Sequence, residues 1–120
     1  MDSHTMDSHT MDSHTLIHLF HILAVGSLFL YVGTNREKIY KPLFPLLMYL
    51  GLFILGYHLG RIYIYLHAGK SIWVNLIHVC IITPLLIYIG FNDVNTPRSF
   101  FELLLMLGFA SIGYHLYYLL

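Results

Sequence analysis

The fold is decided by the stretch LFPLLMYLGLFILGYHLGRI at residues 43–62, which returns at residues 100–119 as FFELLLMLGFASIGYHLYYL. Extending the comparison outward at the same offset of 57 residues aligns residues 16–63 with residues 73–120. Fifteen of the 48 aligned pairs are identical, and the run Gly-Tyr-His-Leu occurs in register in both copies. An internal repeat fixes the architecture, so positions that are unchanged between the copies are the best candidates for a shared role.

The composition is that of a membrane protein. The 120 residues are 58% hydrophobic and 10% charged, with a mean hydropathy of +0.70, whereas a soluble domain carries about 25% charged residues. Crossing a bilayer takes roughly 20 apolar residues of helix, and four segments qualify: residues 16–33, 43–62, 72–91 and 100–120. Because these segments are apolar on all sides, a soluble bundle is excluded. The sequence predicts an all-α bundle of four transmembrane helices.

Short connections divide the membrane domain, residues 16–120, into two tandem helical hairpins at residues 16–63 and 73–120, with a linker at residues 64–72. Each hairpin crosses the bilayer twice, so both copies enter it with the same orientation and a pseudo-twofold axis runs along the membrane normal. The first and third connections hold four basic residues against two on the opposite side: Arg36, Lys38, Lys41 and Arg98 against Arg61 and Lys70. The positive-inside rule predicts cytoplasmic connections and both termini on the outer side.

The first 15 residues are the pentapeptide Met-Asp-Ser-His-Thr three times over. This polar segment is too short to bury a core, so we expect it to be disordered. We interpret it as a tandem expansion without a role of its own, and metal capture by His4, His9 and His14 is the alternative. The formal net charge is zero, so no nucleic-acid partner is indicated. The lipid bilayer is the predicted partner, and a homo-oligomer is left open.

Histidines recur at matched heights in the four predicted spans. Residues that are identical between the copies are spaced by seven within each span, which is nearly two turns and places them on one helix face. His21 lies 12 residues from Gly33, about 18 Å along a helix, and His58 lies 15 residues from Leu43, about 22 Å. Since the repeat copies both positions, the sequence predicts one layer of four histidines in the outer half of the membrane.

The leading hypothesis for this layer is a ligand site for haem b or a transition metal, because imidazole binds haem iron and suits zinc, copper and nickel. Glycines two turns deeper on the same face would leave room for a flat macrocycle, and tyrosines lie beside two of the histidines. The candidate cofactor-binding residues are His21, His58, His78, His115, Gly51, Gly108, Tyr57 and Tyr114, of which the four histidines are the candidate metal ligands.

Two other interpretations of the layer stay open. Histidine titrates between pH 5 and 8, so the layer is also suited to a pH-gated proton or ion pathway, with Asn35 and Asn92 as further relay groups. The third interpretation is a membrane scaffold in which the histidines only specify packing through hydrogen bonds. No Ser-His-Asp set or pair of carboxylates lies within the spans, so the sequence gives no support for hydrolytic catalysis.

The histidine layer resembles in part the four-helix core of b-type membrane cytochromes, where histidine pairs from alternate helices hold haem. All four histidines here lie near one membrane face, so this resemblance implies at most one haem. Residues 16–120 also look like small uncharacterised, duplicated four-helix membrane proteins of large DNA viruses. That resemblance is carried by a Thr-Pro-Arg turn at 96–98, by Glu-Leu-Leu-Leu-Met-Leu-Gly-Phe-Ala at 102–110 and by Gly-Tyr-His at 113–115. It implies a viral or virus-derived source and no particular activity.

Overall fold

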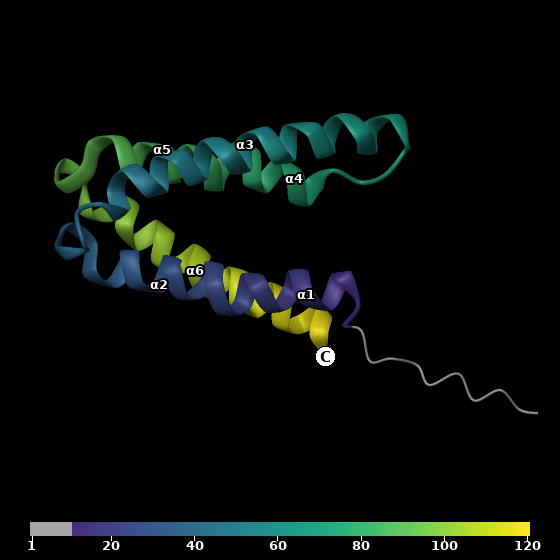
Figure 1. The fold of residues 1–120 in the computed structure, drawn as a ribbon, viewed down its shortest axis with the longest axis horizontal. Coiled ribbons are helices and arrows are strands. Elements are labelled where there is room, and N and C mark those ends of the chain that lie inside the picture. The colour runs from purple at the N-terminus through teal and green to yellow at the C-terminus, as the bar shows by residue number, and fades with distance from the viewer. Residues whose placement is uncertain (1–10) are drawn as a thin grey trace, which may run out of the picture.

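The computed structural model describes residues 11–120, which form helices and no β-strand in that range (Figure 1). The four helical spans are each long and apolar enough to cross a membrane. This confirms the prediction of an all-α membrane protein with four transmembrane-length helices. The elements are α1 (Ser13–Phe20), π-helix η1 (His21–Val25), α2 (Gly26–Asn35), 3-10 helix η2 (Arg36–Lys38), α3 (Leu43–His67), α4 (Trp73–Ile77), π-helix η3 (His78–Ile82), α5 (Thr83–Asn92), 3-10 helix η4 (Asp93–Asn95) and α6 (Arg98–Leu119).

The first span begins earlier than the sequence predicted. Helix α1 starts at Ser13, inside the last Met-Asp-Ser-His-Thr unit, because Asp12 caps it. The carboxylate of Asp12 accepts a hydrogen bond from the backbone N–H of His14 at 3.4 Å. Residues 13–15, which we expected to be disordered, therefore belong to the first helix. His14 is exposed on this turn, and His4 and His9 lie outside the described residues.

The spans pack as two pairs, and each pair takes one helix from either repeat. Helix α3 lies against α5, and α2 lies against α6 (Figure 1). Short connections suggest that the two helices they join pack against each other. Instead, the two helices of each repeat diverge from the connection that joins them (Figure 1). The two pairs meet through α5 and α6 and through η2 and η4, at the end of the molecule that holds the first and third connections.

Glycines explain this choice of partner, since small residues let helices approach closely in lipid. A Cβ atom added to Gly33 would lie 2.7 Å from the backbone nitrogen of Leu105, and one added to Gly90 would lie 2.5 Å from that of Met48. The same approach recurs deeper in the spans: Gly51 against Ile87, and Gly108 against Leu30. Each contact is matched by its equivalent at the 57-residue offset, so the two helix pairs are related by an approximate twofold symmetry.

The apolar core fills the half of the molecule that is nearest these connections. Its central side chains are at most 1% exposed: Phe29, Val32, Phe44, Leu47, Leu86, Ile89, Phe101 and Leu104. They come from all four spans and form one cluster. This half is therefore dry and closely packed, and any route through the bundle must pass it.

Both odd-numbered spans end in the same way. The side-chain amide of Asn35 donates to the carbonyl of Tyr31 at 2.9 Å, and Asn92 donates to Tyr88 at 2.9 Å. The residue that follows each asparagine has a positive φ, 55° and 54°, and turns the chain into the connection. The two asparagines therefore satisfy carbonyl groups in the last helical turn, which accounts for their identity in both repeats.

The start of the fourth span departs from its sequence pattern. Ser99 followed three residues later by Glu102 has the spacing of a capping box. In the structure α6 begins at Arg98 after Pro97, without a side-chain cap, and Glu102 accepts from Nε of Arg98 at 2.7 Å. The carboxylate of Glu102 therefore pairs with the guanidinium of Arg98 one turn earlier. In a capping box it would instead accept from the backbone N–H of Ser99.

We expect Gly90→Ala to destabilise the fold by about 1–3 kcal/mol, because its new methyl group would overlap the backbone of α3. Gly56→Ala is the matched control, since an added Cβ there has no neighbour within 4 Å and alanine favours a helix. Unfolding midpoints in detergent micelles would measure both changes. Equal stability of the two variants would contradict the proposed role of the glycine contacts.

Candidate functional site

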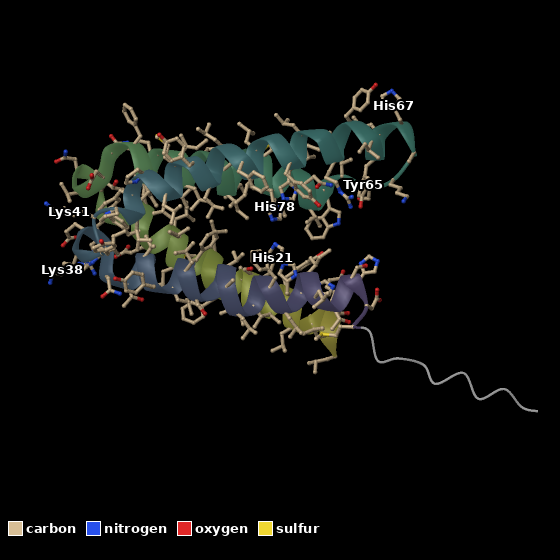
Figure 2. The ribbon with its side chains drawn as sticks, in the orientation of Figure 1. His21, Lys38, Lys41, Tyr65, His67 and His78 are labelled. Carbon is tan, nitrogen blue, oxygen red and sulfur yellow. The ribbon has the colours of Figure 1, made fainter. Side chains whose placement is uncertain are left out.

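The four histidines that the repeat singles out lie in one cluster between the helix pairs. The imidazole of His58 on α3 stacks on that of His78 on η3, with centroids 4.0 Å apart and planes at 17°. The equivalent rings of His115 on α6 and His21 on η1 stack at 4.2 Å and 22°. Figure 2 shows His21 and His78 facing each other from the two helix pairs, and their ring centroids are 6.4 Å apart. The cluster thus joins the pairs through a central contact that is flanked by two stacks.

A hydrogen bond holds the outer ring of each stack. Nδ1 of His58 donates to the side-chain oxygen of Asn75 at 2.7 Å. The equivalent bond joins Nδ1 of His115 to Nδ1 of His18 at 2.8 Å. His18 therefore takes the place that Asn75 has in the other half, and the chain of contacting imidazoles extends to five rings.

The two central histidines are oriented by their own helices. Nδ1 of His21 lies 2.8 Å from the carbonyl of Ile17, and Nδ1 of His78 lies 2.7 Å from that of Val74. A carbonyl oxygen only accepts, so Nδ1 carries the proton in both rings. In the neutral form, Nε2 of each ring can then accept a hydrogen bond.

A wider helical turn begins at each central histidine. The amide of Gly26 bonds to the carbonyl of His21, and that of Thr83 bonds to the carbonyl of His78, which gives the two π-helical segments. The hydroxyl of Thr83 donates to Val79 at 3.0 Å and so satisfies a carbonyl that the wide turn leaves free. The Gly26-Ser27 and Thr83-Pro84 pairs predict helix weak points here. Such turns are frequent at functional sites.

The other predicted site residues lie around the cluster. The rings of Tyr57 and Tyr114 each stand edge-on to the following histidine at 5.1 Å, but Tyr57 is 51% exposed on the outside of the bundle. Gly51 and Gly108 face the neighbouring helix of their own pair, whose atoms occupy the space beside them. The structure therefore brings the four histidines together and uses the two glycines for close helix packing.

His18 and Asn75 complete the cluster but were not among the candidate residues, because they differ between the repeats. The signal that identifies them is weaker than identity: both are polar, and they occupy aligned positions in otherwise apolar spans. Tyr118 stacks on His18 with centroids 5.8 Å apart. Arg61, one turn beyond His58 on α3, has its guanidinium 6.0 Å from the centre of the Tyr57 ring.

The closely stacked rings leave little room between them for a large cofactor. Within residues 11–120, no group of three or more His, Cys, Asp or Glu side chains is placed to hold a metal ion. The stacked rings are about 4 Å apart, which leaves no width for a macrocycle between them. What the cluster provides is a set of contacting titratable rings across the boundary between two helix pairs.

Comparison with known proteins adds no family assignment. No family model, curated protein or solved structure matches the chain. The candidate site therefore rests on the geometry of this chain and on the agreement between its two halves.

The equivalence of His18 and Asn75 can be tested by exchange. His18→Asn should keep a partner for Nδ1 of His115, which is buried, and should leave stability nearly unchanged. His18→Leu should cost about 1–3 kcal/mol, because it leaves that buried group unsatisfied. Unfolding midpoints in the same detergent measure both. If His18→Leu is as stable as His18→Asn, the hydrogen bond has no role in holding the cluster.

Proposed function

We propose that this is an acid-responsive membrane protein in which protonation of the histidine cluster separates the two helix pairs and opens a pathway for protons or small ions. The observation that carries the proposal is the contact between His21 and His78, with a stacked imidazole on either side. In the half of the molecule away from the core, titratable rings form the junction between the pairs.

Charge repulsion supplies the force for separation. His21 and His78 belong to different helix pairs, and protonating both rings places two positive charges about 6.4 Å apart across the boundary, which costs on the order of 3 kcal/mol at an effective dielectric constant of 20. Arg61 adds a further positive charge close to the cluster. The other titratable side chains beside the histidine cluster are Tyr57, Tyr114 and Tyr118. No acidic residue occurs between Glu37 and Asp93, so α3 and the third span provide no counter-charge.

The fold offers both a hinge and a plug for this motion. The pairs are joined at the connections through the dry core, so they can separate at the histidine end while staying attached at the other. The π-helical segments directly after His21 and His78 are the weak points of their spans and can absorb bending. For ions to pass, the separation must also loosen the core around Phe44 and Phe101, which is closed in this structure.

The proposal includes a sidedness. The basic residues of the first and third connections favour a cytoplasmic location for these loops and an outer location for both termini. The two repeats would then be inserted as two hairpins of the same orientation. The histidines would then lie in the outer half of the membrane. Acidification from outside, rather than from the cytoplasmic side, is the expected trigger.

Purified protein in liposomes that contain a pH-sensitive dye tests the proposal. Proton entry should rise by tenfold or more when the pH on the side of the termini falls from about 7.5 to about 5.5, the range in which histidine becomes charged. The double variant His21→Gln with His78→Gln replaces the two rings that face each other across the boundary with amides that cannot titrate, and its flux should stay flat. In a Cys80→Ala background, labelling of Lys38→Cys and of Asn95→Cys from one side reports the orientation, and both positions should react from the same side.

His67→Gln is the matched control, because His67 lies exposed near the end of α3 and bonds only to the carbonyl of Tyr63. Its flux should follow that of the parent. Acid-dependent flux in the double variant would show that these histidines are not the gate. If parent and variants are tight at every pH, the cluster serves packing, and the protein is a membrane scaffold.

A transition-metal or haem site is the second candidate; it would require the stacked rings to move apart, and the orientation of the central rings is the observation in its favour. Histidine ligands commonly donate their second ring N–H to a carbonyl group, as Nδ1 of His21 and His78 does here. Absorption spectra and metal analysis of the same preparation decide the matter. A Soret band or a stoichiometric metal that His78→Gln removes would replace the gating proposal.

A further inference from the structure

A cleft of about 180 Å³ lies between the two helix pairs, beside the histidine cluster. One wall comes from α4 and η3 and includes Trp73, Ile77 and His78, and the other comes from α6 and includes Ser111 and His115. The rings of Trp73 and Tyr114 meet edge-on at 5.8 Å across the same boundary. The lining is therefore mostly apolar and aromatic, with imidazole and hydroxyl groups among it.

The cleft arises where the two repeats differ. Ala110 and Ser111 form part of its wall on α6, whereas the aligned residues on α3 are Phe53 and Ile54. The second repeat thus has two small side chains at a point where the first has two large ones. Phe53 is 72% exposed, whereas Ile54 packs against the core, so the smaller side chain of Ser111 is the difference that leaves more room in the wall on α6.

Size and chemistry together define what fits. An apolar cavity of about 150 Å³ accommodates a benzene molecule, so this cleft suits one six-membered ring. Nδ1 of His78 already donates to Val74, so the neutral ring offers Nε2 as an acceptor and calls for a ligand that donates. Trp73 and Tyr114 supply aromatic surface for a flat ring.

We propose that this cleft binds the ring of a neutral phenol or quinol, whose hydroxyl group donates to Nε2 of His78. The ligand would contact both helix pairs at once, through His78 on one and the α6 wall on the other. Binding of this ligand does not require proton conduction. The site can therefore be tested whether or not acid opens a pathway through the protein.

Trp73 is the single tryptophan of the chain and lines the cleft, so its fluorescence reports binding directly. The probe is 4-propylphenol, added to the full-length protein in nanodiscs near neutral pH. We expect a saturable change in Trp73 emission, and 4-propylanisole, which has the same ring but no donor, should bind about fivefold to tenfold more weakly. If a long-tailed quinol placed in the bilayer competes with the probe, the ligand is a membrane-borne ring. If the quinol does not compete, the ligand is a free phenol.

The double variant Ala110→Phe with Ser111→Ile copies the first repeat and fills the cleft, so the saturable signal should disappear while the helical circular dichroism is kept. Ser111→Ile alone narrows the cleft and is the second variant if the double one does not fold; it should weaken binding at least fivefold. Equal affinity for the phenol and its methyl ether would overturn the proposal. So would an unchanged signal in a folded cleft-filling variant.

Discussion

The structure depends on the close approach of helices from different repeats at four glycine positions. Where Gly33 meets Leu105 and Gly90 meets Met48, a single added methyl group would overlap backbone atoms of the neighbouring helix. These contacts commit each span to a partner in the other repeat. They also set the arrangement of everything else, because the two pairs that they build meet each other at the connections, the core, the histidines and the contact between Trp73 and Tyr114.

Two kinds of contact then hold the pairs together, and they respond differently to pH. At the connection end, Phe29, Phe44 and Phe101 are buried in an apolar core whose packing does not depend on protonation. At the other end His21 and His78 face each other, each with a second imidazole stacked on it. Protonation acts on the contact at the histidine end, whereas the apolar core would loosen only through the motion of the helix pairs that we propose. This contrast is the physical basis of the proposed gate.

The repeat made much of this predictable, since identity at an offset of 57 residues acts as a comparison between two related sequences. It located the four histidines at one height, and the residue types of the aligned pairs Gly26-Ser27 and Thr83-Pro84 indicated a weak point in each odd-numbered span. It could not choose helix partners, because the loops are compatible with packing inside a hairpin, and only the depth of the glycine contacts decides between the alternatives. Identity between the repeats did not single out His18, because its counterpart, Asn75, is a different residue. The two side chains nevertheless make equivalent hydrogen bonds. The free space beside Ala110 depends on side-chain volumes across two helices, which a single sequence pattern does not convey.

A distance between spin labels on the two helix pairs measures the motion that we propose, in which protonation moves the pairs apart at the histidine end. Labels at Tyr63 on α3 and Tyr117 on α6 would lie on different pairs, at exposed positions beyond the cluster, in a Cys80→Ala background that removes the native thiol. In nanodiscs, we expect this distance to lengthen as the pH falls from about 7.5 to about 5.5, and the change to be lost when His21 and His78 are both glutamine. A distance that stays the same across this range, in protein that remains folded, would contradict the account.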